Sequence, residues 1–223
     1  MNENSLKARF QKLKQTLAPM SWAERWEYLF TYYKWVLWVL IGIIVLGSII
    51  GSSIKNATTE VLLSGVTVNI TLNEEVADYL GDDYFAHIGG REGKQIIELS
   101  QLQLDEKTPD TLYTTVAKIS GMAAIERLDY LLLDTTALEH FLDQSLYVDL
   151  RQILSPEDLA QWEDALVYNT VEGEQVPVAI DLAGTDFAQR YYGENVTCYL
   201  AFVATSPRKE ACQAFWTYLE VGP

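Results

Sequence analysis

The chain has few of the side chains that enzymes most often use for acid–base or metal chemistry. Among 223 residues there are two histidines, His87 and His140, and two cysteines, Cys198 and Cys212. Two histidines are too few for a classical zinc site unless cysteines or carboxylates complete it. The sequence also lacks a G-x-S-x-G elbow, a Walker loop, a dinucleotide-binding glycine fingerprint and an H-E-x-x-H helix. We therefore expect a protein that is not an enzyme and has neither a metal site nor a cofactor.

Positive charge is scarce outside the N-terminal segment. Residues 1–34 hold six Lys/Arg against three Asp/Glu, which leaves ten basic and twenty-eight acidic residues for the remainder, a net charge of −18. Nucleic-acid binding depends on a basic surface that neutralises phosphates. The charge therefore argues against nucleic acid as a partner.

One long stretch, Trp35–Ile54, contains no charged side chain. A helix of twenty residues is about 30 Å long, which matches the hydrocarbon thickness of a bilayer. A buried core helix rarely runs so far without a polar residue, and a cleaved signal peptide usually has a shorter apolar region nearer the N-terminus. The stretch therefore predicts an uncleaved transmembrane anchor.

The flanking charges predict the orientation of this anchor. Six Lys/Arg precede the span, whereas only Lys55 follows it closely. Positive residues near a span are retained on the cytoplasmic side. We expect a single-pass protein of the cell membrane, with residues 1–34 cytoplasmic, 35–54 in the bilayer and 55–223 extracytoplasmic.

A helix is expected to begin just before the span. Ser21 and Glu24 have the spacing of a capping box, in which each side chain accepts a backbone N–H of the other residue. Pro19 favours a chain break upstream. A single helix should then run from Trp22 into the membrane.

The extracytoplasmic part reads as one α/β domain of 169 residues. Strand-like runs alternate with helix-like runs, which favours a layered α/β fold over a sandwich. The expected strands are Val61–Thr71, Ile96–Leu104, Leu128–Leu133, Val176–Ile180 and Val196–Ala204, and the expected helices are Asn73–Leu80, Leu112–Ile125, Thr136–Gln144 and two that begin near Ser155 and Ser206. The continuous apolar run Leu128–Leu133 is typical of a strand that is buried on both faces of a parallel sheet.

The two cysteines have two interpretations that the sequence leaves open. Cys198 and Cys212 both lie in the exported part, where oxidation is permitted, and a disulfide would close a short strand-to-helix loop. Two small buried thiols would explain the same pair equally well.

Two stretches of the extracytoplasmic part have an order of helices and strands that can be compared with known families. In Leu112–Leu154 an alanine-rich helix precedes the strand Leu128–Asp134, and the next helix ends before Tyr147–Leu150. Further on, the strand Cys198–Ala204 leads into the helix start Ser206–Phe215. This order resembles the extracellular solute-binding proteins of bacterial ABC importers.

The resemblance implies a reduced periplasmic-binding-protein-like α/β domain that follows a long N-terminal transmembrane helix. The leader Met20–Trp35 is in turn similar to those of single-span membrane proteins of Firmicutes. The chain departs from the solute-binding family in having no lipobox cysteine and in lacking most of a second lobe between Leu154 and Val176. Without a second lobe that closes over it, a solute should bind weakly or not at all.

The functional expectation follows from this resemblance. It implies a non-catalytic binding or accessory module at the outer face of the membrane, with a protein partner in the cell envelope such as an ABC transporter. The alternative is a structural or assembly protein that binds protein partners and no small molecule. In both cases the lipid bilayer is a partner, and the sequence does not decide whether a small-molecule ligand binds.

Candidate ligand-binding residues follow from topology and from the resemblance. Ligands in open α/β sheets bind beyond the carboxyl ends of the strands. Asp134, Thr135 and Asp181 directly follow two of the expected strands, so they are the candidate polar lining. The alternative interpretation is that Asp134 and Asp181 cap the helices that follow them.

Overall fold

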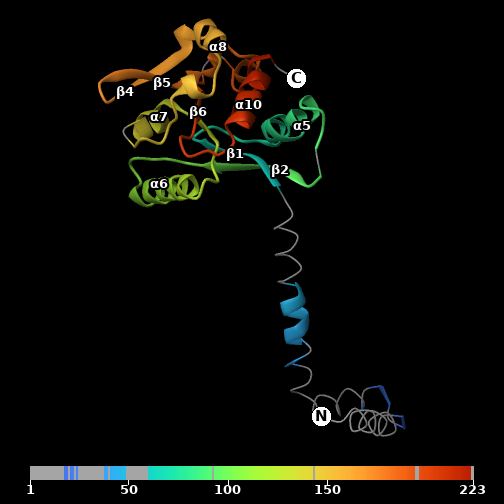
Figure 1. The fold of residues 1–223 in the computed structure, drawn as a ribbon. Coiled ribbons are helices and arrows are strands. Elements are labelled where there is room, and N and C mark those ends of the chain that lie inside the picture. Colours follow the sequence, from blue (N-terminus) through green and yellow to red (C-terminus); the bar gives the residue numbers. More distant parts are fainter. Residues whose placement is uncertain are drawn as a thin grey trace. The chain divides into compact units, whose positions relative to one another are not determined.

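The computed structural model describes residues 18–19, 21–22, 24, 38–39, 41–48, 60–91, 93–142, 144–193 and 196–221. The chain divides into two compact units, Met1–Thr58 and Thr59–Pro223 (Figure 1).

The N-terminal unit contains the expected capping box. The Ser21 N–H donates to Glu24 Oε2 at 2.8 Å, and the Glu24 N–H donates to Ser21 Oγ at 3.5 Å. Residues 41–48 are helical. Within the described residues no helix has the length and apolar character that a membrane span requires. Half of the expected span Trp35–Ile54 lies outside the described residues, so the anchor is unsupported by the structure and stays a prediction.

The C-terminal unit is an α/β domain, as the sequence predicted. Its described residues form a six-stranded mixed sheet in the order β2-β1-β3-β6-β5-β4 (Figure 1). The strands are β1 (Glu60–Val68), β2 (Gln95–Leu102), β3 (Tyr130–Leu133), β4 (Leu166–Val171), β5 (Glu174–Asp181) and β6 (Tyr199–Phe202). Strands β2 and β3 pair with β1 in parallel, whereas β6 is antiparallel to both β3 and β5. Strand β5 therefore runs in the same direction as β1, β2 and β3.

Helices cover both faces of this sheet. They are α4 (Glu74–Asp78), α5 (Tyr84–His87), α6 (Pro109–Ala124), α7 (Thr135–Leu142), α8 (Pro156–Gln161), α9 (Asp186–Tyr191) and α10 (Lys209–Val221), with the π-helix η1 (Tyr79–Asp83) between α4 and α5. Short 3-10 turns lie at η2 (Leu150–Gln152), η3 (Glu163–Ala165) and η4 (Leu182–Gly184). Helix α6 lies on one side of the sheet and α10 on the other (Figure 1).

Alternation along the strands sends side chains into two separate cores. Tyr130 and Leu132 of β3 pack with the α10 core, while Leu131 and Leu133 pack with the core under α6 and α7. All four are fully buried. Strand residues point alternately to opposite faces, so a strand covered on both sides must be apolar throughout. This confirms a strand that is buried on both faces, although it begins at Tyr130 rather than Leu128 and is parallel to β1 but antiparallel to β6.

Most of the expected elements are present, and the differences have local causes. Strand β1 ends at Val68 rather than Thr71, because Asn69 adopts a left-handed φ of 60° that breaks the extended backbone. The sequence did not predict β4 or α9. The region between Leu154 and Val176, where second-lobe material was expected to be missing, contains α8, η3 and the edge strand β4.

Strand β1 passes close to an aromatic ring at Gly65. A Cβ atom at this position would lie 2.1 Å from Tyr130 Cζ, far inside van der Waals contact. Tyr130 is fully buried and its ring centroid is 4.4 Å from that of Phe215 on α10. The absence of a side chain at Gly65 therefore lets Tyr130 fill the space between β1 and α10.

We predict that Gly65→Ala destabilises the C-terminal unit by about 1–3 kcal/mol, the usual cost of overpacking a core. The matched control is Gly121→Ala on α6, where the added methyl meets no atom within 4 Å. That control should be neutral or stabilising by up to about 1 kcal/mol, because alanine favours a helix over glycine. Urea unfolding of the fragment 59–223 measures both, and equal effects would show that the close approach of Tyr130 does not matter.

Candidate functional site

Strand order defines a candidate binding edge on the sheet. Strands β2 and β3 lie on opposite sides of β1, so the order in which successive strands are added to the sheet reverses at β1. In open α/β sheets, ligands bind in the crevice that such a switch point leaves at the carboxyl ends of the strands. Val68 pairs with Leu133, Leu133 with Tyr199, and Tyr199 with Asp181. The residues that follow β1, β3 and β5 are therefore brought to one edge, which we call the carboxyl edge.

Asn69 ties the strands together at this edge. Its Nδ2 donates to the Leu104 carbonyl at 3.0 Å and to Asp134 Oδ2 at 3.1 Å, and its Oδ1 accepts the Leu104 N–H at 2.8 Å. Asparagine tolerates the left-handed backbone better than most residues do. The side chain thus links the ends of β1 and β3 to the chain beyond β2.

Two of the three candidate residues are helix caps. Asp134 Oδ1 accepts the Ala137 N–H at 2.8 Å, at the start of α7, and Asp181 Oδ1 accepts the Ala183 N–H at 2.9 Å, at the start of η4. The capping interpretation of both residues is therefore confirmed. It does not test a ligand-binding role, which stays a prediction.

The structure nevertheless brings the three candidates to the same edge. Thr135 directly follows Asp134, is exposed, and has its Oγ1 3.2 Å from Thr197 Oγ1. Asp181 lies two strands away, about 10 Å along the sheet at the usual strand spacing. Strand β6 lies between them, so the three side chains line one edge rather than one small pocket.

Further residues at this edge were missed by the sequence reasoning. The Tyr192 hydroxyl donates to the Thr71 carbonyl at 3.1 Å, and Gln101 Oε1 accepts the Leu72 N–H at 3.1 Å. Asn69 and Thr197 were missed as well. Asn69 alone had a recognisable signal, since an asparagine that ends a β-branched run often marks a turn.

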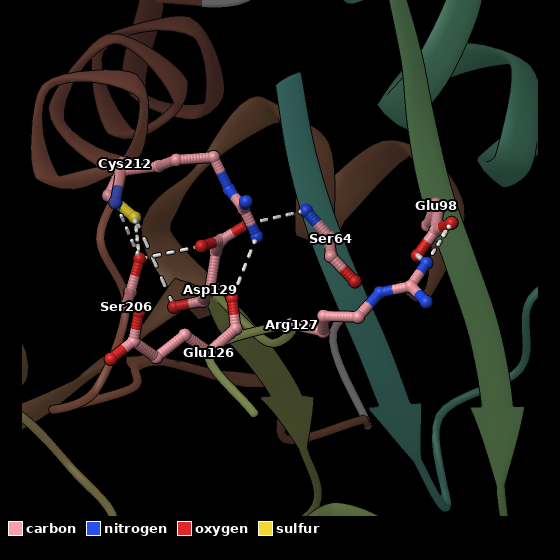
Figure 2. Close-up of polar contacts among 8 residues, drawn as sticks. Ser64, Glu98, Glu126, Arg127, Asp129, Ser206 and Cys212 are labelled. Carbon is pink, nitrogen blue, oxygen red and sulfur yellow. Dashed lines mark hydrogen bonds and ion pairs between the residues drawn. The ribbon is translucent and has the colours of Figure 1, made fainter. Parts of the chain in front are cut away.

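A second polar group lies at the opposite, amino end of β3, around a fully buried carboxylate. Asp129 Oδ2 accepts the Ser64 N–H at 2.7 Å and Arg208 Nε at 2.9 Å, and its Oδ1 accepts the Ser206 hydroxyl at 2.6 Å. Arg208 also reaches the Glu126 carbonyl at 3.5 Å. Figure 2 shows these contacts converging on Asp129 from β1 and from the segment that precedes α10.

Cys212 lies beside this network without the properties of a nucleophile. Its Sγ is 3.9 Å from Ser206 Oγ and is fully buried. Burial, reinforced by the Asp129 carboxylate, raises the pKa of the Cys212 thiol to about 12. Reactive cysteines need an accessible thiolate, so this thiol is structural.

The two cysteines are not joined. Cys198 and Cys212 are both buried free thiols, so the structure corrects the disulfide interpretation in favour of two buried thiols. Burial and the nearby Asp181 carboxylate also raise the pKa of Cys198. Small buried thiols of this kind pack as apolar side chains.

Neither histidine belongs to a metal-binding cluster of described residues. His87 packs against the Tyr218 ring at 5.0 Å, and His140 Nδ1 is 3.8 Å from Glu106 Oε1. In the part of the chain that the structure describes, no three His, Cys, Asp or Glu side chains are grouped so that they could hold a metal ion.

Comparison with known proteins does not add a family. No family model, no curated protein and no solved structure matches the chain.

We predict that Asp129→Asn destabilises the C-terminal unit by about 3–5 kcal/mol, because it leaves the partly buried Arg208 without its counter-charge. Glu98→Gln is the matched control, because the Arg127–Glu98 pair in Figure 2 is largely exposed and worth at most about 1 kcal/mol. Thermal and urea unfolding compare the two variants. A loss below 1 kcal/mol for Asp129→Asn would contradict a structural role for the buried network.

Proposed function

We propose that the chain is a membrane-tethered, non-catalytic binding module that recognises a protein partner of the cell envelope through the carboxyl edge. The observation that carries this proposal is the convergence of Asp134, Thr135 and Asp181, with Asn69 and Thr197, at the ends of β1, β3, β5 and β6. Edges at a topological switch point are the usual place for binding in open α/β sheets.

The rigidity of the edge supports recognition. Asp134 is held from two sides, by the Ala137 N–H and by Asn69 Nδ2, and Asp181 is held by the Ala183 N–H. Side chains fixed before association lose little conformational entropy when a partner binds. The edge therefore offers polar groups in defined positions at a low entropic cost.

The shape of the edge favours a macromolecular partner over an enclosed solute. The three candidates extend over about 10 Å of sheet edge instead of surrounding a single cavity. Two of their carboxylate oxygens are already occupied by backbone N–H groups. A small solute would find few free acceptors here, whereas a protein surface can contact the adjacent exposed Thr135 and Thr197 and extend along the edge towards Asp181.

Charge and the expected anchor support the cellular setting of this proposal. The net charge of −18 outside residues 1–34 favours a partner with a complementary basic surface. The resemblance to solute-binding proteins makes the membrane subunits of an ABC importer one such partner. The charge asymmetry around Trp35–Ile54 would place the domain on the outer side of the membrane.

The structural or assembly role is the competing function, and the capping roles of Asp134 and Asp181 favour it. Both carboxylates cap the start of a helix, and this role explains their presence without any ligand. Under this alternative the partner would also be a protein, so the two functions differ in the partner's identity and not in the surface used.

Site-specific photo-crosslinking in native membranes tests the proposed surface. A photoreactive residue at Thr135 or Thr197 should give a discrete adduct with one envelope protein, because both side chains are exposed on the carboxyl edge. The matched control is Ile125, which is 64% exposed at the C-terminal end of α6 and lies shortly before the amino end of β3, opposite the carboxyl edge. An ABC importer subunit in the adduct would favour the transport role, and another envelope protein the assembly role.

Two results would contradict this prediction. An adduct from Ile125 but not from Thr135 or Thr197 would place the interface elsewhere. The absence of an adduct from any of the three positions, with the variant chain present in the membrane at normal levels, would argue against a stable protein partner.

A further inference from the structure

The six-stranded sheet has two edge strands, β2 and β4. An edge strand presents unpaired backbone N–H and C=O groups that can pair with a strand of another chain. Proteins usually protect such edges with charged side chains, with proline, with a bulge or with a covering segment. The two edges of this sheet differ in that protection.

Strand β4 is protected in three ways. It is joined to β5 by the two-residue loop Glu172–Gly173, whose φ angles of 52° and 88° are those of a hairpin turn. The residues that flank such a loop form a hydrogen-bonded pair, so the Thr170 N–H points away from β5, where Asn169 Oδ1 accepts it at 2.8 Å. The ladder with β5 also contains a register shift, and Glu172 and Glu174 add negative charge.

Strand β2 lacks this protection. Its sequence, Gln95–Leu102, contains no lysine and no proline, and Glu98 is its only charged residue. The register shift in its ladder with β1 adds a residue to β1 and leaves β2 continuous. Every residue of the strand is at least partly exposed, which leaves this edge accessible.

The backbone of β2 offers hydrogen-bonding groups along this edge. The Leu102 carbonyl accepts the Asn69 N–H at 3.1 Å, so the backbone of Leu102 faces β1. Backbone groups of successive strand residues point to opposite sides, so the N–H and C=O groups of Ile97, Leu99 and Gln101 face away from β1. Within the described part of the chain, no residue forms a backbone hydrogen bond to these outward groups.

The single charge on β2 is neutralised. Glu98 pairs with Arg127 at 2.8 Å (Figure 2). Ile97 and Leu99, on the opposite face of the strand, pack against the α10 core. Two β2 edges can therefore approach each other without the repulsion that the acidic residues beside β4 would cause, although the unit as a whole is strongly acidic.

We propose that β2 is a dimerisation edge, at which a second copy of the chain adds its own β2 in the antiparallel direction and joins the two sheets. A two-fold axis perpendicular to the sheet keeps α6 of both copies on one face and α10 of both copies on the other. With the axis at Leu99, this residue lies opposite Leu99 of the second copy, and Ile97 lies opposite Gln101 of the second copy. The outward backbone groups of these residues form the hydrogen-bonded pairs of the new ladder.

Charge selects this register over its neighbour. An axis at Glu98 would place the two Glu98 carboxylates directly opposite each other, and like charges in that position destabilise a sheet. The axis at Leu99 places each Glu98 opposite Ser100 of the second copy, whose hydroxyl donates to the carboxylate. The outer side of β2 is distinct from the carboxyl edge, so a failure of this proposal would leave the proposed function unchanged.

Disulfide trapping of the purified full-length chain in detergent tests the dimer and its register. A mixture of Glu98→Cys and Ser100→Cys chains should give a disulfide-linked dimer on oxidation, because opposite residues of a non-hydrogen-bonded pair have Cα atoms about 4.5 Å apart. Either variant alone should give little dimer, because its two thiol-bearing residues are offset by two positions, with Cα atoms about 8 Å apart. Cys198 and Cys212 are buried free thiols, so they do not compete.

A charge series at Ser100 tests the same contact without a covalent link. Ser100→Lys should tighten the dimer about two- to tenfold, because each lysine faces Glu98 of the second copy, and Ser100→Glu should weaken it by a similar factor. The matched controls are Thr170→Lys and Thr170→Glu on β4, which should leave the dissociation constant unchanged. Sedimentation equilibrium measures all four variants against the parent chain.

Three results would overturn the proposal. They are the absence of a disulfide-linked dimer from the mixture, a dimer from Glu98→Cys alone that forms as readily as that from the mixture, and equal dissociation constants for Ser100→Lys and Ser100→Glu. A purified chain that stays monomeric, while a photoreactive residue at Ser100 captures another protein in cells, would also overturn it and would assign the edge to a strand of that protein.

Discussion

The buried carboxylate of Asp129 is the interaction on which the rest of the C-terminal unit depends. A fully buried charge is tolerated only when opposite charge and hydrogen bonds replace the lost water. Ser64, Ser206 and Arg208 supply those groups from β1 and from the segment before α10. The carboxylate thus fixes three parts of the chain that are more than sixty residues apart in sequence. Helix α10, which directly follows one of them, packs Phe215 against Tyr130 of β3.

Fixing the amino end of β3 has a consequence at the other end of the same strand. Strand β3 is four residues long, so Asp129 before it and Asp134 after it lie at opposite edges of one short, doubly buried strand. Asp129 is held by Ser64, Ser206 and Arg208. Asp134 is held by Asn69 and by the start of α7. The carboxyl edge is therefore a rigid surface whose exposed polar groups, Thr135 and Thr197, remain available for a partner.

Local sequence signals predicted much of this architecture, and long-range pairing explains what they missed. The helix caps at Asp134 and Asp181 could be expected because each bonds within three residues along the chain. The role of Asp129 could not, because its partner Arg208 is 79 residues away and the residue reads as part of an apolar strand. Strand β4 was missed because an edge strand buries little, so its pattern of apolar residues is weak. The ring contact between Tyr79 and Phe187 of α9 joins residues far apart in the chain, which no local pattern reveals.

Native-state hydrogen exchange at the Ser64 amide tests the central role of the buried carboxylate most directly. This N–H donates to Asp129 Oδ2, so it can reach water only if the whole network opens. We expect it to exchange by global unfolding, with a free energy equal to that from urea unfolding of the fragment 59–223. The Thr170 amide of the edge strand β4, which donates to the neighbouring Asn169 side chain, should exchange through local opening at a much lower free energy. Exchange of Ser64 at the rate of Thr170 would contradict the account, because the network would then open without unfolding the domain.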